Sequence, residues 1–216
     1  MKKILLAALG VILIAFLIIA YFYQQMPETM ASHWNVQGEV DGYMPKVWAL
    51  FLMPLMSVVL LILFIFLPKI DPLKKNIEKF LNYYEWFILI MIIFLFYIHM
   101  LTLLFSLGIE FNMTQALVPA LGILIFYLGA MMKNSKRNWF IGIRTPWTLS
   151  SDVVWEKTNI LGGKLFQVAG GLVFLTLVVP DYGFWLMILP LLAVVVFSFV
   201  YSYLEFKKEI AKLSKK

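Results

Sequence analysis

The sequence predicts an all-α integral membrane protein in which six transmembrane helices form a bundle with both termini in the cytoplasm. Hydrophobic residues make up 62% of the 216 positions, charged residues make up only 14%, and the mean hydropathy is +0.89. Soluble domains carry about 25% charged residues, so this composition excludes a soluble fold. The protein is expected in the cell membrane as a multi-pass protein.

Six apolar segments have the length that a membrane span requires, which is roughly 20 residues for an α-helix. The predicted spans are Ile4–Tyr23, Val47–Leu67, Tyr83–Gly108, Thr114–Met132, Leu165–Val179 and Tyr182–Leu204. The first follows Met1-Lys2-Lys3, as a secretory signal would. We interpret it as a retained helix, because it is longer than the apolar core of a signal and no small-residue cleavage site follows it.

The distribution of basic residues predicts the orientation. With Lys2 and Lys3 in the cytoplasm, Lys46 is the one lysine or arginine of the eighteen that would lie outside. Cytoplasmic loops carry the excess of lysine and arginine in membrane proteins. The basic residues lie at helix ends, where anionic lipid head groups account for them. No continuous basic patch is present, so direct binding of nucleic acid is not expected despite the net charge of +6.

The chain divides into three predicted regions. Residues 1–68 form a two-helix unit with an external loop, residues 69–132 supply the third and fourth spans, and residues 133–216 hold a cytoplasmic loop and the last two spans. The external loop (Gln24–Lys46) and the cytoplasmic loop (Lys133–Lys164) are the longest connections. Long loops in compact proteins are often functional, so these two loops are expected to carry the function.

The external loop is predicted to be compact and rich in turns, because Gly38 and Gly42 accept positive φ and Asn35 and Asp41 favour turns. Its candidate site residues are those that would meet a molecule arriving from outside: His33, Trp34, Asn35, Gly38 and Asp41. One histidine among scattered carboxylates lacks the spacing of a metal site. We therefore expect no metal there and expect His33 and Trp34 to attach the loop to the bundle.

The cytoplasmic loop is predicted to lie along the membrane surface. Aromatic and apolar residues fill Trp139–Trp147, and Pro146 holds Thr145 in an extended conformation. An amphipathic interfacial helix is predicted over Asp152–Leu161, between the fourth and fifth spans, with Ser150 or Ser151 as its N-cap and Gly162-Gly163 as its end.

In this interpretation one set of side chains attaches the loop to the membrane and another binds a soluble partner. Trp139, Phe140, Val153 and Val154 are the predicted membrane contacts. The candidate partner-binding residues are Arg144, Thr145, Pro146, Trp147, Asp152, Trp155 and Glu156. Arg144 has three further possibilities: binding a lipid phosphate, stacking on a tryptophan, or pairing with Asp152 or Glu156.

No catalytic or cofactor-binding motif is present, so the sequence predicts neither an enzyme nor a cofactor. His99 is the only ionisable residue deep in a predicted span. Such residues are often functional, although we favour a neutral histidine that hydrogen-bonds Ser or Thr within the bundle.

Two groups of motifs resemble known families. IGIRTPWTLS at 141–150, VWEKTN at 154–159 and GGK at 162–164 resemble the signature of the SdpI family of multi-pass immunity proteins against a sporulation-delaying toxin. HWN at 33–35 with Gly38, then Asp41-Gly42 and Lys46, resembles a domain of unknown function often found at the N-terminus of the same proteins.

The resemblance implies a membrane immunity and signalling protein. Such a protein would protect its host from an extracellular peptide toxin and would hold a small winged-helix repressor at the cytoplasmic face. The expected partners are therefore membrane lipid, a secreted peptide toxin and the repressor. A small transporter or lipid-handling protein is the alternative. A coupled transporter normally buries charged residues at mid-membrane, and this chain has only His99 there.

Overall fold

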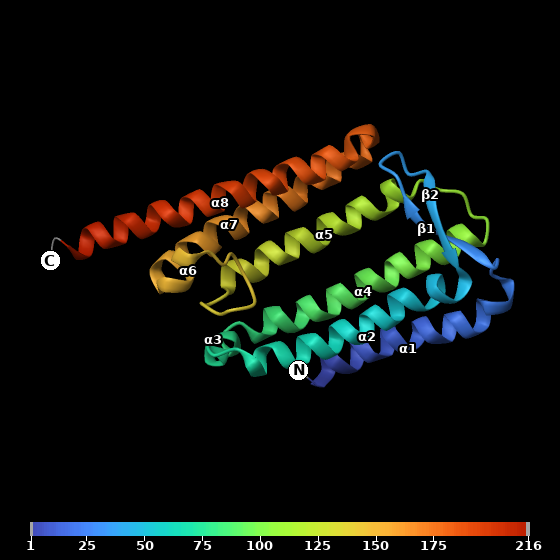
Figure 1. The fold of residues 1–216 in the computed structure, drawn as a ribbon, viewed down its shortest axis with the longest axis horizontal. Coiled ribbons are helices and arrows are strands. Elements are labelled where there is room, and N and C mark those ends of the chain that lie inside the picture. The colour runs from blue at the N-terminus through green and yellow to red at the C-terminus, as the bar shows by residue number, and fades with distance from the viewer. Residues whose placement is uncertain (1, 215–216) are drawn as a thin grey trace.

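Six long helices run side by side along the longest axis of the molecule (Figure 1). The computed structural model describes residues 2–214. The helices are α1 (Lys2–Phe22), α2 (Lys46–Ile70), α4 (Leu81–Ser106), α5 (Met113–Asn134), α7 (Asp152–Leu172) and α8 (Gly183–Leu213). With the 3-10 turns η1 (Tyr23–Gln25), η2 (Val173–Leu177) and η3 (Pro180–Tyr182), all six are long and apolar enough to cross a membrane. The predicted six-span helical bundle is confirmed; its orientation stays a prediction.

The helices form two groups of three. Helices α1, α2 and α4 pack on one another, as do α5, α7 and α8, and α4 packs against α5 to join the groups (Figure 1). Large apolar side chains cover the outside, among them Leu17 at 59% exposure and Val196 at 64%. A bilayer solvates such a surface as well as a protein core would, so the exposed apolar face is the expected lipid contact.

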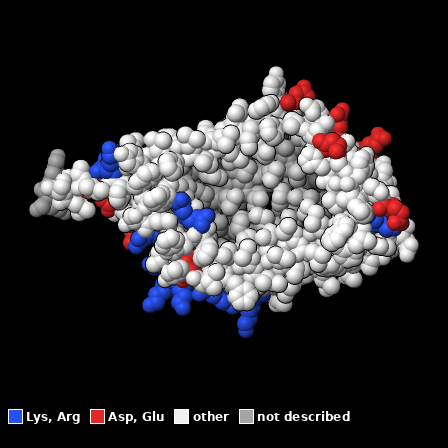
Figure 2. Space-filling model, viewed as in Figure 1, with Lys and Arg blue, Asp and Glu red and all other residues white. Residues whose placement is uncertain are grey.

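The shorter elements mark the two ends of the bundle. Strands β1 (Thr29–Trp34) and β2 (Val40–Pro45) pair antiparallel as a hairpin at one end. Helices α3 (Lys74–Glu78) and α6 (Pro146–Ser150) lie at the other end, where α1 begins and α8 finishes (Figure 1). Figure 2 shows the basic side chains gathered at this second end and the acidic ones prominent at the hairpin end. We call these the α3 end and the hairpin end.

The predicted helix over Asp152–Leu161 is not a separate element. Its residues form the first part of α7, which continues through Gly162 and Gly163 into the membrane span. The helix that carries the fifth span therefore begins at Asp152 and not near Leu165. The short helix between the fourth and fifth spans is α6 instead.

The two glycines serve helix packing and do not end the helix. A Cβ on Gly163 would lie 2.5 Å from the carbonyl oxygen of Gly129 on α5, and one on Gly129 would clash with the carbonyl oxygen of Gly163. Gly170 and Gly122 repeat this close approach further along the same two helices. Small residues that let backbones meet are typical of membrane helix interfaces, and this interface overrides the helix-ending tendency of paired glycines.

His99 on α4 is 1% exposed and lies near Pro54 and Ser57 of α2 in a space too small for water. Its Nε2 has no hydrogen-bond partner within residues 2–214. The hydroxyl of Ser57 donates to the carbonyl oxygen of Met53, at 2.8 Å, and not to the histidine. The expected serine or threonine bond to this ring nitrogen is therefore not formed.

Candidate functional site

The hairpin has a tight turn whose shape comes from Asn35 and Gly38. The backbone N–H of Asn35 donates to the carbonyl oxygen of Glu39 at 2.9 Å, and Asn35 Oδ1 accepts from the N–H of Glu39 at 3.0 Å. Gly38 has φ +84°, a conformation that suits glycine. The loop is therefore compact, as predicted, and it also forms two strands that its turn residues do not predict.

The hairpin is attached to the bundle through the connection between α4 and α5. The Trp34 ring packs edge-on against Phe105 of α4, with ring centroids 5.5 Å apart. Asn112 caps α5 by accepting from the N–H of Gln115 at 2.9 Å, and its amide donates to the carbonyl oxygen of Gln37 at 2.9 Å. Trp34 thus takes the attaching role predicted for it.

His33 points away from this contact. Its side chain is 72% exposed, and Nδ1 lies 2.5 Å from Asp41 Oδ1 across the hairpin. Glu28 pairs instead with the mostly buried Lys46, at 2.6 Å. Within residues 2–214, no three histidine, aspartate or glutamate side chains gather in a way that could hold a metal ion. His33 and Asp41 therefore form an exposed polar pair on the hairpin.

A cavity of about 240 Å³ lies beneath the hairpin. Ser32, His33 and Trp34 line one side of it, and side chains of α4 and α5 line the other, including Thr102 and Thr114. The hairpin end thus offers an exposed polar pair above a small recess at the boundary between hairpin and helices.

At the α3 end, residues 135–151 form the α5–α7 segment, which is folded around Asn138. This side chain is fully buried. Its Oδ1 accepts from the N–H groups of Phe140 and Ile141, at 2.9 and 2.6 Å. Its amide donates to the carbonyl oxygens of Lys136 and Ile141, at 2.8 and 2.9 Å. One amide therefore satisfies four backbone groups that would otherwise be buried without partners.

Asn159 of α7 also hydrogen-bonds the backbone of the segment. It is 1% exposed, its Oδ1 accepts from the N–H of Ile143 at 2.8 Å, and its amide donates to the carbonyl oxygen of Trp155 at 3.2 Å. Gly142 has φ +109°, and a Cβ there would lie 2.5 Å from Asn159 Oδ1. Asn159 therefore faces the interior of the protein and not solvent.

The α5–α7 segment also binds the connection between α2 and α3. The buried carboxylate of Asp71 accepts from the backbone N–H of Trp139 at 2.8 Å and from that of Leu73 at 2.6 Å. The Asn76 amide donates to the carbonyl oxygen of Arg137 at 2.8 Å. These bonds join the two groups of helices at the α3 end.

On its other side the segment binds α8 through α6. Thr145 and Thr148 form a reciprocal capping box at the start of α6, and the Thr145 hydroxyl lies 3.0 Å from that of the buried Ser202 on α8. The Trp147 ring lies 5.0 Å from the rings of both Phe199 and Tyr203. The Thr-Pro-Trp motif thus holds the segment against α8.

The charged side chains of the segment bind carboxylates of α7 or the backbone. Arg144 donates to the carbonyl oxygen of Trp139 at 2.6 Å. Lys136 pairs with Glu156 at 3.2 Å, and Arg137 Nε lies 2.7 Å from Asp152 Oδ1 without good hydrogen-bond geometry. Of the three possibilities for Arg144, the pairing with Asp152 or Glu156 is not observed, because both carboxylates have other partners.

The predicted partner-binding residues differ in whether they are packed within the protein or exposed to solvent. Thr145 and Trp155 are buried, and the Trp155 Nε1 donates to the carbonyl oxygen of Ser135 at 3.3 Å. Trp147 is half-buried against α8, whereas Arg144, Pro146, Asp152 and Glu156 remain exposed. Only this last group can contact a soluble partner directly.

The predicted membrane contacts divide in the same way. Val154 is fully buried, and Phe140 packs on the core, so neither supplies an exposed membrane anchor. Trp139 and Val153 are each about half exposed, at 50% and 51%. Val154 lies inside because α7 turns that face toward its neighbours, which an isolated interfacial helix would not do.

A groove of about 390 Å³ lies beside the exposed residues, between the start of α7 and the end of α8. Asp152 and Val153 line one wall, and Ile210 and Leu213 line the other. Ile210 and Leu213 are 51% and 67% exposed, on a part of α8 that extends beyond the rest of the bundle (Figure 1). The groove therefore combines charged and apolar side chains.

Two separate parts of the chain match families of known proteins. Residues 10–58, which include the hairpin, match the Domain of unknown function (DUF1648). Residues 134–202 match the SdpI/YfhL protein family. The chain is 28% identical over 209 residues to Immunity protein SdpI of Bacillus subtilis (strain 168), which covers 96% of this chain and 98% of that protein.

No solved structure matches the chain. The relative is named as an immunity protein and not as an enzyme, and the six apolar helices agree with a multi-pass protein of the cell membrane. The part of the chain that resembles the SdpI/YfhL protein family, residues 134–202, holds the α5–α7 segment and most of the two helices that follow, and this is the resemblance that the sequence motifs predicted.

Proposed function

We propose that this protein protects the cell that carries it from an extracellular peptide toxin. The observation that carries the proposal is the match to an immunity protein over nearly the full length of both chains. A match of this extent includes the hairpin end as well as the family region. The similarity to the immunity protein is therefore not limited to one fragment of the chain.

The hairpin is the surface that we assign to the toxin. In the predicted orientation it faces outward, and it is the largest ordered element outside the helices at that end. The exposed His33–Asp41 pair and the recess of about 240 Å³ beneath it offer a polar contact next to a half-apolar pocket. A membrane-active peptide presents the same combination, because it must be soluble outside and apolar at the bilayer.

The test is survival of a toxin-sensitive host that expresses the protein and is exposed to the matched toxin. Protection is expected for the unaltered chain, and a loss of protection is expected for His33→Ala with Asp41→Ala at an unchanged membrane level. Gln24→Ala is the matched control, because Gln24 is exposed in η1 at the same end but lies outside the hairpin. Survival no better than that of the empty vector would refute the proposal.

We further propose that the α3 end holds a small winged-helix repressor at the membrane. The groove between α7 and α8 supports this assignment, because Asp152 and Arg137 supply charges and Ile210 and Leu213 supply exposed apolar contacts. Interfaces combine an apolar centre with a polar rim in this way. The test is whether a fluorescent fusion of the repressor moves from the cytoplasm to the membrane when the protein is expressed.

The alternative of a transporter has one supporting feature, a cavity of about 430 Å³ between α4 and α5. Its lining is apolar apart from Tyr97, whose hydroxyl already donates to the carbonyl oxygen of Ala116 at 3.0 Å. A polar substrate would find no free partner there. The cavity therefore favours occupancy by membrane hydrocarbon over transport of a solute.

A further inference from the structure

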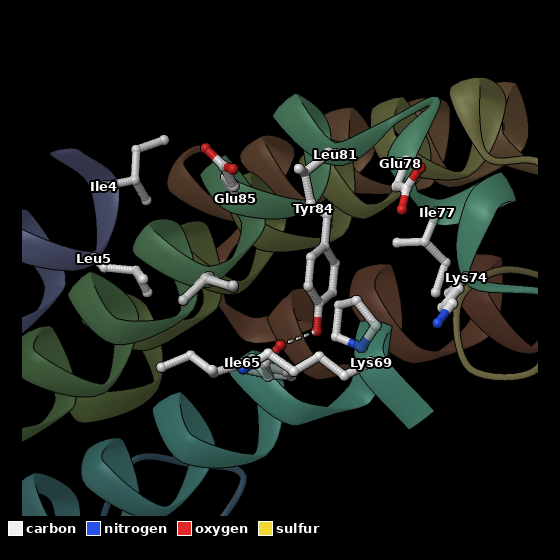
Figure 3. A pocket seen from close by; sticks show the side chains of 13 residues that line it. Ile4, Leu5, Ile65, Lys69, Lys74, Ile77, Glu78, Leu81, Tyr84 and Glu85 are labelled. Atoms are coloured by element: carbon white, nitrogen blue, oxygen red, sulfur yellow. Dashed lines mark hydrogen bonds between the residues drawn. The ribbon is translucent and has the colours of Figure 1, made fainter. Parts of the chain in front are cut away.

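A further cavity, of about 260 Å³, lies at the α3 end between α1, α2, α3 and α4 (Figure 3). Leu5, Phe64, Ile77 and Leu81 supply much of its apolar wall. The one phenol in the lining, that of Tyr84, donates to the carbonyl oxygen of Phe64 at 2.8 Å and so has its partner within the wall. The interior therefore suits hydrocarbon.

Two lysines from different elements line the opening of this cavity. Lys69 is near the end of α2 and lies over the Phe66 ring, with Nζ 5.1 Å from its centroid. Lys74 begins α3, and its Nζ has no hydrogen-bond or ion-pair partner within residues 2–214. Both side chains are exposed. An apolar recess is thus bordered by two ammonium groups.

Acidic groups line the other side. Glu78 on α3 and the buried Glu85 on α4 both contribute to the lining (Figure 3). A carboxylate repels a phosphate that comes close to it. An anionic head group would therefore be held on the side of Lys69 and Lys74.

We propose that this cavity is a binding site for one anionic phospholipid. Part of an acyl chain fills the apolar interior, and the lipid phosphate contacts Lys69 and Lys74. The charge of the α3 end supports this occupant, because the basic side chains of the molecule gather there (Figure 2). Anionic lipid head groups are attracted to such clusters at the ends of membrane helices.

The size and the lining also select among possible ligands. Pockets for drug-sized ligands measure about 300–1,000 Å³, so this cavity accepts a segment of chain and not a folded peptide. A free phosphate ion would gain nothing from the apolar wall. The site therefore distinguishes a phospholipid from an inorganic anion. This inference does not depend on the proposed immunity function.

The test compares two pairs of lysines that carry the same charge. Lys69→Gln with Lys74→Gln removes the two that line the cavity, and Lys75→Gln with Lys79→Gln removes two nearby that do not. Binding of phosphatidylglycerol and of phosphatidylcholine to the purified full chain in detergent is measured by native mass spectrometry. The first pair is expected to weaken binding of phosphatidylglycerol about 25-fold, and the second pair by less than about twofold.

A third variant tests the apolar half of the site. Leu5→Trp fills the cavity and leaves every charge in place, so it is expected to reduce binding of phosphatidylglycerol as well. Unfolding temperatures in lipid-free detergent show that each variant is folded; where Leu5→Trp is not, the two lysine pairs decide.

Three results would overturn the proposal. Equal losses for the two lysine pairs would show diffuse electrostatic attraction. Equal binding of phosphatidylcholine and phosphatidylglycerol by the unaltered chain would show that charge plays no part. Displacement of the bound lipid by millimolar inorganic phosphate would show a simple anion site.

Discussion

The Asp71 carboxylate accepts a hydrogen bond from the backbone N–H of Trp139, at 2.8 Å, across a separation of 68 residues. Asp71 follows α2, in one group of three helices, and Trp139 lies in the α5–α7 segment, which belongs to the other. Asp71 is only 2% exposed, so this bond is shielded from water. Together with the hydrogen bond from Asn76 to Arg137, this contact joins the two groups at the α3 end.

Asp71→Ala is expected to destabilise the protein by about 1–3 kcal/mol, because it leaves the part-buried N–H groups of Trp139 and Leu73 without this acceptor. Asp71→Asn keeps one acceptor oxygen and is expected to lose less. The measurement is the thermal unfolding midpoint in detergent. Asp181→Ala is the control, because Asp181 is exposed. Equal midpoints for the two alanine variants would contradict the assignment.

Gly163→Ala is expected to disturb the contact between α5 and α7, because its Cβ would lie 2.5 Å from the carbonyl oxygen of Gly129. Overpacking of this kind costs about 1–3 kcal/mol. Gly171→Ala on the same helix is the matched control, since its Cβ would meet nothing within 4 Å. The amount of folded protein after detergent extraction measures the effect, and a similar yield for both would disprove the close packing.

Adjacent valines are expected to respond differently to a charge. Val154→Asp places a carboxylate where the side chain is fully buried, so folding and membrane level should fall sharply. Val153→Asp changes a side chain that is 51% exposed, so its membrane level should be retained. Immunoblots of membrane fractions measure both. An unchanged membrane level for Val154→Asp would contradict the buried position of Val154 on α7.

Arg144→Ala and Glu156→Ala are expected to leave the membrane level intact and to abolish recruitment of the proposed repressor. The first removes one exposed hydrogen bond to the carbonyl oxygen of Trp139, and the second removes an exposed ion pair with Lys136. Exposed pairs of this kind contribute little to stability, whereas exposed charges direct recognition. Loss of the protein from the membrane in Arg144→Ala would show that Arg144 is a structural anchor.

The predicted orientation can be tested with single cysteines, because the chain has none of its own. Val36 in the hairpin turn is 48% exposed, and Asn134 at the end of α5 is exposed. An impermeant maleimide applied to intact cells is expected to label Val36→Cys and to spare Asn134→Cys. The reverse pattern would invert the topology and would move the toxin contact to the α3 end.

The transmembrane helices could be predicted from the sequence, because a bilayer imposes a length and a polarity that each span must satisfy. The identity of the helix contacts could not. Gly162 and Gly163 have the local signature of a helix end, yet both lie in the middle of α7, where Gly163 closely approaches Gly129 on α5. The start of α7 was misplaced because that approach is a tertiary effect.

The α5–α7 segment shows the same limit in its polar residues. Asn138 and Asn159 organise it, yet an asparagine in a sequence looks equally suited to solvent. The available signal was the glycine at position 142, since backbone with positive φ inside an apolar segment needs a partner for its polar groups. The aromatic and Arg-Thr-Pro residues were predicted to bind a partner or the membrane, and most of them serve packing.

The hairpin is bonded to the α4–α5 connection through Asn112 and Gln37, and the α3 end is bonded through Asp71 and Trp139. The apolar cavity of about 430 Å³ lies between these two ends, where α4 meets α5. The two groups of helices are therefore joined by hydrogen bonds at both ends, and a cavity separates α4 from α5 between these ends. Separation of the two groups along this line would therefore have to break the hydrogen bonds at one of the two ends first.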